Sequence, residues 1–241
     1  VFAAFSGSHQ DAINKCLAID EANRAANGPD SHWRVAYLPI DPRDVGRTYQ
    51  EVIRINSQSG KGGVAYVLEQ DYGLQLPRWM QVDFSPMVQK AAEVSETEVS
   101  GEQIWNIFQD TYINVPDQIT VSSYQASREE GSDQLKAVLK TVHGPVEIES
   151  KGKGILDAFV SAINLKLNTA LVLVDYAEHT LGQNEEAEAM AYVQLSINGK
   201  RSCGAGRSED IVGASLRAVL NGISRAGVEI RPSQQSRLEA V

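Results

Sequence analysis

An approximate internal repeat in the second half of the chain constrains the fold more than any other feature of this sequence. Residues 133–152 and 187–206 each read as two strands joined by a tight turn. The turn lies at His143-Gly144 in the first copy and at Asn198-Gly199 in the second. Two similar segments of this kind predict two similar β-rich units.

Each copy also carries a Gly-x-Gly element, an amphipathic helix and one further strand. The Gly-x-Gly elements are residues 152–154 and 204–206, the helices 154–167 and 210–227, and the further strands 119–129 and 169–181. The spacing between glycines and helix differs by several residues, so the match is approximate. The pattern predicts a pseudo-symmetric domain of two βββα-like units.

The first half lacks this repeat and predicts small helical or mixed subdomains. A helix is expected over 6–29, capped by Ser8, and a short helix over 47–55, capped by Asp44. A Gly-rich loop and strand are expected over 57–68. Two further helices are expected over 76–94 and 100–113, the second with a Ser100–Gln103 capping box. The predicted class is therefore α+β, with domains 1–56, 57–116 and 117–230 and a flexible tail 231–241.

Composition excludes several classes of protein. The net charge is −9, which opposes nucleic-acid binding, and no apolar run reaches the roughly 18 residues that span a membrane. Cys16 and Cys203 are far apart and read as free thiols in the cytoplasm. The four histidines show no metal-binding spacing, so no metal site is expected. A start at Val1 suggests a piece of a longer polypeptide; loss of a short leader is the alternative.

Two features suggest chemistry. His9 lies in Ser-Gly-Ser-His-Gln-Asp at a helix start, where donors converge. The paired Gly-x-Gly elements could cradle a carboxylate beside the apolar run 170–176, which ends in Tyr176. Such a pocket suits an aliphatic amino acid; the alternative is that helix packing requires the glycines. Residues 57–63 do not match a phosphate-binding P-loop, because Ile55 replaces its first glycine.

Four segments resemble the α-isopropylmalate synthase family: FSGSHQDAINK, YLPIDPRDVGRTYQEVIRINSQSGKGGVAYV, DYAEH and ASLRAV. The resemblance runs from residue 1 to about residue 226. It implies an enzyme that condenses acetyl-CoA with 2-oxoisovalerate in leucine biosynthesis. It also implies a catalytic barrel with a divalent metal (Mg, Mn or Zn), two linker subdomains, and a regulatory domain that binds leucine as a homodimer.

The resemblance assigns roles to individual residues. His9 and Tyr37 match the family's contributions from the linker subdomain that caps the partner's active site, in residues 1–56. The barrel lies outside this sequence, so the chain alone should hold no cofactor and should not catalyse the condensation. The leucine-binding positions match Gly152, Lys153, Gly154, Leu156, Asp157, Leu173, Tyr176, Thr180, Ala187 and Ile211.

Some of these residues depart from the family pattern. Lys153 replaces asparagine, Thr180 replaces a small apolar residue, and Asp157 could pair with the ligand's ammonium group. A weaker leucine affinity or another effector therefore stays open. Two other functions also stay open: a free-standing amino-acid-binding module, and the same half of a citramalate or homocitrate synthase.

Overall fold

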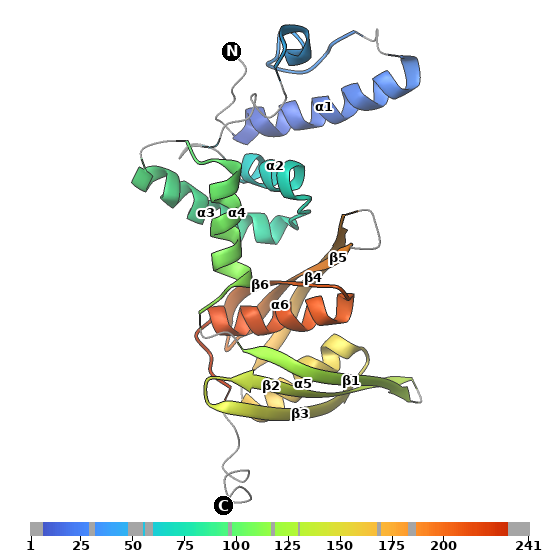
Figure 1. Cartoon of the computed structure of the whole chain (residues 1–241), viewed down its shortest axis with the longest axis vertical. Helices are drawn as coiled ribbons and strands as arrows, with labels where there is room; N and C mark the ends of the chain where they lie inside the picture. Colours follow the sequence, from blue (N-terminus) through green and yellow to red (C-terminus); the bar gives the residue numbers. More distant parts are fainter. Residues whose placement is uncertain are drawn as a thin grey trace, which may run out of the picture. The chain divides into compact units, whose positions relative to one another are not determined.

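The computed structural model forms two compact units, residues 1–107 and 108–241 (Figure 1). The structure describes residues 7–28, 32–47, 55, 60–95, 98–116, 119–129, 131–167, 170–182 and 187–230. The domain boundaries expected at residues 56 and 116 stay predictions.

The first unit is mainly helical. Its elements are α1 (Gly7–Asn27), a 3-10 helix (Pro42–Val45), α2 (Lys61–Tyr72), α3 (Arg78–Ser95) and α4 (Gly101–Phe108). The predicted capping box of α4 is confirmed: the Ser100 N–H donates to Gln103 Oε1 at 2.8 Å and the Gln103 N–H donates to Ser100 Oγ at 3.2 Å. The helix expected over 47–55 lies almost wholly outside the described residues.

Two expectations for this unit are wrong. The strand expected at residues 64–68 and the preceding residues 61–63 of the Gly-rich loop belong to helix α2. Val64, Tyr66 and Leu68 are all buried, and a five-residue apolar run buried in this way is too short to distinguish a strand from a helix. Ser8 lies inside α1, not at its N-cap, because the helix already begins at Gly7.

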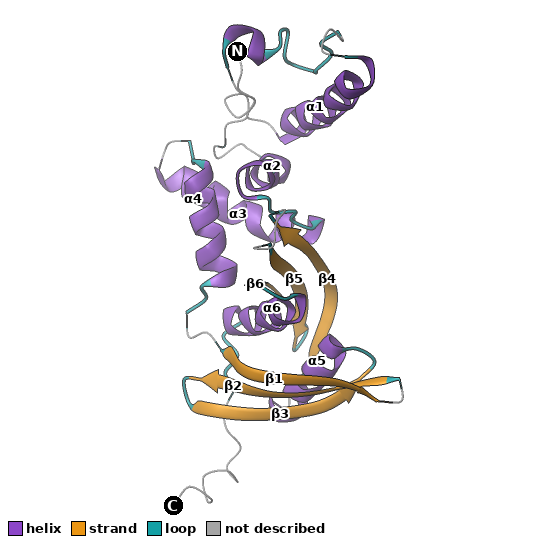
Figure 2. Ribbon diagram, turned by 45° about the vertical axis from the view of Figure 1, so that its right-hand side comes forward, coloured by secondary structure: helices purple, strands orange, loops and turns teal. Residues whose placement is uncertain are grey.

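The second unit confirms the predicted βββα repeat. Its first copy consists of β1 (Thr120–Glu129), β2 (Ser132–Thr141), β3 (Gly144–Gly152) and α5 (Ile155–Leu167). Its second consists of β4 (Leu171–Leu181), β5 (Glu188–Ile197), β6 (Lys200–Ser208) and α6 (Ile211–Arg225). Each copy forms one antiparallel sheet in the strand order of the sequence (Figure 2).

One hydrophobic core joins the two copies. Helix α5 packs on β2 and β3, and α6 packs on β5 and β6. Phe159 and Ile163 of α5 share a buried cluster with Leu216 of α6 and Leu195 of β5. In both views α6 lies between the two sheets (Figures 1 and 2). The starts of α5 and α6 are therefore held by the same core.

The two hairpins turn differently. The Asn198-Gly199 turn is confirmed, and both residues have positive φ, 51° and 81°. The first hairpin pairs Thr141 with Gly144, so its turn is Val142-His143, one residue earlier than predicted.

The two Gly-x-Gly elements are not structurally equivalent, which corrects the expectation from the repeat. Gly152 ends β3, whereas Gly204 and Gly206 lie inside β6, buried beneath α6. A methyl group at position 204 would lie 2.2 Å from the Ala218 carbonyl oxygen. The second element therefore serves the close approach of strand and helix, and not a ligand.

Helix α6 also contacts the π-helix Gln109–Ile113, the first element of the second unit. The buried Asn221 donates through Nδ2 to the carbonyl oxygens of Ile113 (3.2 Å) and Ala205 (2.8 Å). The guanidinium of Arg225 lies 4.7 Å from the centroid of the Tyr112 ring. The C-terminal half of α6 is thus bound to both the π-helix and β6.

Candidate functional site

A cavity of about 350 Å³ lies where the two helices of the repeat begin. Residues from the start of β2, the starts of both helices and one face of β4 line it: Asp133, Gly154, Ile155, Leu156, Asp157, Tyr176, Glu178, Ile211, Val212 and Ser215. The walls combine aliphatic side chains with three carboxylates. This combination suits a small ligand with an apolar body and a cationic group.

The two helix starts differ in how their backbone N–H groups are satisfied. Asp210 caps α6 by accepting the Gly213 N–H at 2.6 Å, and this bond is the main cause that lowers the pKa of Asp210. Gly154, the residue before α5, has no side chain to cap the first turn. Asp157 instead accepts the Lys153 N–H at 2.9 Å. The residue that precedes the first turn of α5 therefore offers no side chain to its N–H groups, and the start of a helix favours an anion.

A tyrosine forms the polar edge of the cavity. The Tyr176 hydroxyl donates to the Glu178 carboxylate and lies 2.7 Å from Ser215 Oγ. Burial and the bond to Glu178 raise the pKa of Tyr176 to about 12. These bonds tie β4 to the first turn of α6 and orient Glu178.

The raised pKa of Tyr176 predicts a pH dependence of stability. The folded value of about 12 exceeds the ordinary value of 10.0, so the folded chain binds more protons. Its contribution is complete below about pH 10 and is lost as the pH rises toward about 12. We expect Tyr176→Phe to show a shallower loss of unfolding free energy in urea titrations over this range. An unchanged pH profile in the variant would contradict the prediction.

Five of the predicted leucine-binding residues line this cavity: Gly154, Leu156, Asp157, Tyr176 and Ile211. The other five do not. Gly152 and Lys153 precede it in the chain, Leu173 packs against the hydrophobic core, and Thr180 and Ala187 lie further along β4 and before β5. Their role in binding stays a prediction.

Sequence reasoning missed five lining residues: Asp133, Ile155, Glu178, Val212 and Ser215. Glu178 lies two residues after Tyr176 on a strand and therefore shares its face. Ser215 lies four residues after Ile211 on a helix and shares its face in the same way. Asp133 reaches the cavity only through the packing of the first sheet, which no local pattern reveals.

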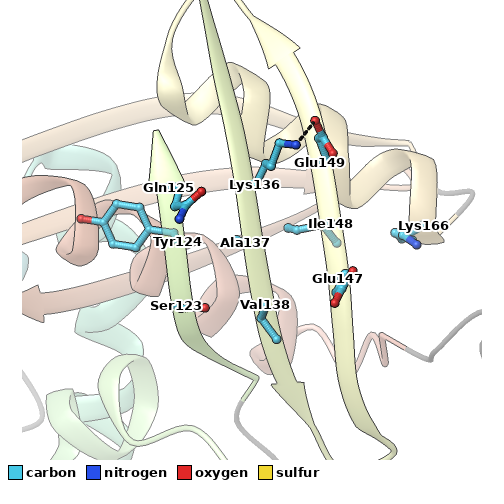
Figure 3. A pocket seen from close by; sticks show the side chains of 10 residues that line it. All are labelled: Ser123, Tyr124, Gln125, Lys136, Ala137, Val138, Glu147, Ile148, Glu149 and Lys166. Atoms are coloured by element: carbon cyan, nitrogen blue, oxygen red, sulfur yellow. Dashed lines mark ion pairs between the residues drawn. The ribbon is translucent and has the colours of Figure 1, made fainter. Parts of the chain in front are cut away.

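A larger cavity of about 620 Å³ lies along the sheet β1-β2-β3 (Figure 3). Charged side chains dominate it, and Lys136 already pairs with Glu149 at 3.1 Å. Figure 3 shows these side chains spread over neighbouring strands rather than converging on a point. The smaller cavity therefore offers the better chemistry for an aliphatic ligand.

The first unit brings together the two residues predicted to act in catalysis. The rings of His9 and Tyr37 lie with their centroids 4.3 Å apart, tilted by 39°. Both side chains are exposed, Tyr37 to 59%. They form a surface pair that could act on a molecule bound from outside this unit.

Among the residues that the structure describes, no group of three or more His, Cys, Asp or Glu side chains could hold a metal ion. No described helix is both long and apolar enough to cross a membrane.

Comparisons with known proteins match both parts of the chain. Residues 1–69 match the family described as "Alpha-isopropylmalate synthase, post-catalytic domain-like", and residues 98–226 match the "LeuA allosteric (dimerisation) domain". The cavity between α5 and α6 lies within the second match.

Three relatives carry the description 2-isopropylmalate synthase. They come from Thermobifida fusca (44% identical), Mycobacterium leprae (42%) and Brucella suis (43%). The matches cover 94%, 94% and 93% of this chain but only 40%, 38% and 40% of those proteins. The chain thus spans about 40% of the length of these relatives.

Proposed function

We propose that this chain binds leucine in the cavity between α5 and α6. The chain belongs to the family of LeuA allosteric (dimerisation) domains and is the C-terminal portion of a 2-isopropylmalate synthase. The observation that carries the proposal is the pairing, within one cavity, of a helix start preceded by glycine with carboxylates and aliphatic side chains. An amino acid needs these three surfaces for its carboxylate, its ammonium group and its side chain.

Each part of leucine has a place in the cavity. Its carboxylate would accept N–H groups of the first turn of α5, next to Gly154. Its ammonium group would lie among Asp133, Asp157 and Glu178. Its isobutyl group would contact Leu156 and Ile211, as hydrophobic burial favours.

The full polypeptide would condense acetyl-CoA with 2-oxoisovalerate, using a divalent metal in a barrel outside this sequence. His9 and Tyr37 would complete the active site of the partner in a cytoplasmic homodimer. His9 would help the general base or position substrate, and Tyr37 would hydrogen-bond within the site. Leucine would inhibit to the extent that it prefers one arrangement of the enzyme over another. The chain alone is then not expected to catalyse the condensation.

Calorimetric titration of the chain with leucine tests the binding proposal. We expect saturable heat with leucine and weaker binding of isoleucine, whose branch lies nearer the charged groups. Apolar pockets distinguish closely similar aliphatic groups by only about 1–3 kcal/mol of binding free energy. Isoleucine, an isomer of leucine with the same charged groups, is therefore the matched control. Absence of heat with both amino acids would overturn the proposal.

A further inference from the structure

Tyr37 has a backbone conformation that its residue type disfavours. Its φ is +64°, in a region that only glycine adopts freely. It lies in a turn closed by the Leu38 N–H donating to the Val35 carbonyl oxygen at 3.3 Å. Val35 and Leu38 are buried while Tyr37 is exposed. Such a conformation persists only where neighbouring contacts hold it.

The contacts after the turn come from a buried carboxylate. Asp41 is 3% exposed and pairs through Oδ2 with Arg24 Nη2 of α1 at 2.9 Å and with Arg43 Nη2 at 2.8 Å. Arg24 in turn pairs with Asp20 of α1 at 2.7 Å. Charge-assisted pairs of a buried carboxylate with arginine are strong and directional. They fix the segment after Tyr37 to the helix that carries His9.

The same arginine reaches the segment before the turn. The Arg24 guanidinium lies 5.9 Å from the centroid of the Trp33 ring. The Trp33 indole N–H donates to the Leu38 carbonyl oxygen at 2.8 Å, across the turn. Arg24 therefore contacts groups on both sides of Tyr37.

From this arrangement we infer that Asp41 and Arg24 are positioning residues that hold Tyr37 against His9 for the condensation. The inference rests on the proposed role of His9 and Tyr37 in the active site. Neither Asp41 nor Arg24 needs to touch substrate: Asp41 binds Arg24, Arg24 anchors both flanks of the turn, and the turn aims Tyr37.

Asp41→Asn isolates this role. An asparagine amide oxygen still caps the 3-10 helix by accepting the Arg43 N–H, which Asp41 Oδ1 accepts at 3.0 Å. The charge that pairs with both arginines is lost. Asp44→Asn is the matched control, because it makes the same change in the same 3-10 helix at an exposed position.

The first measurement uses the chain itself and does not depend on any activity. Because the two ring centroids lie 4.3 Å apart, we expect the Tyr37 ring to shift the NMR signals of the His9 imidazole protons. We expect Asp41→Asn to move these signals toward those of Tyr37→Ala while circular dichroism stays native, and Asp44→Asn to leave them in place. Arg24→Lys, which keeps the charge but loses the planar fork, should give an intermediate shift and serves where Asp41→Asn fails to fold. If the His9 imidazole signals stay in place in both Asp41→Asn and Arg24→Lys, the positioning role is overturned.

The second measurement uses the full-length enzyme. We expect Asp41→Asn to lower kcat about tenfold or more through misplacement of Tyr37, with KM for 2-oxoisovalerate little changed. In a Tyr37→Ala background the same change should have no further effect on kcat. Multiplying effects would overturn the inference and leave the proposed function intact. Full activity of Tyr37→Ala would instead overturn the proposed role of Tyr37.

Discussion

Gly206→Ala is expected to destabilise the second unit by about 3 kcal/mol or more, because the strand and the helix leave no room for a side chain. A methyl group at this position would lie 2.1 Å from the Ala214 carbonyl oxygen and 2.5 Å from the Ala218 nitrogen. Both atoms belong to the backbone of α6, which cannot move aside without leaving the core. Urea unfolding followed by circular dichroism measures the loss.

Gly154→Ala is the matched control from the other Gly-x-Gly element. Its φ is not positive, and no atom lies within 4 Å of an added methyl group. We expect its unfolding free energy to stay within about 0.5 kcal/mol of the original value, the usual range for a surface change. Equal effects of the two changes would mean that close packing does not explain Gly206.

Ile211→Glu is expected to weaken leucine binding at least about a hundredfold without unfolding the chain, because the new carboxylate would have to be desolvated against the isobutyl group of leucine. Ile211 is 38% exposed and begins α6, where a carboxylate suits the helix dipole. In the cavity it adds a negative charge beside Asp133, Asp157 and Glu178 and removes an aliphatic contact. The isobutyl group of leucine, which contacts Ile211 in the proposed binding mode, would face a charged group. Calorimetry measures the change in Kd.

Val142→Glu provides the comparison for that change. It makes a similar apolar-to-acidic replacement at an exposed position in the turn between β2 and β3, away from the cavity residues. We expect its leucine affinity to match the original chain. A comparable loss in both variants would place the effect in the net charge and not in the cavity.

The architecture of the second unit could be predicted because its signals are local. Alternating strands, the Asn198-Gly199 turn and the amphipathic helices each specify their own element, and repetition doubles the signal. The equivalence of the Gly-x-Gly elements could not be predicted in this way. Whether a glycine serves a ligand or a neighbouring helix depends on the packing partner, which for Gly206 is Ala214 of α6.

The first unit offered weaker signals. Residues 64–68 are too few to separate a buried strand from one face of a helix, and tertiary packing decided for α2. The pairing of His9 with Tyr37 came from the family resemblance and not from any pattern in the residues. The ion pair of Asp41 with Arg24 had no sequence signal, because Arg24 lies 17 residues away in another element.

Helix α6 lines the cavity with Ile211 and Ser215 and contacts the π-helix Gln109–Ile113 about two to four turns later through Asn221 and Arg225. A hydrogen-bonded helix of this length is stiff, and the core beneath it is close-packed. The two ends of α6 are therefore expected to move together. A ligand that displaced its first turn would therefore also displace the π-helix, because one helix of 15 residues contacts both.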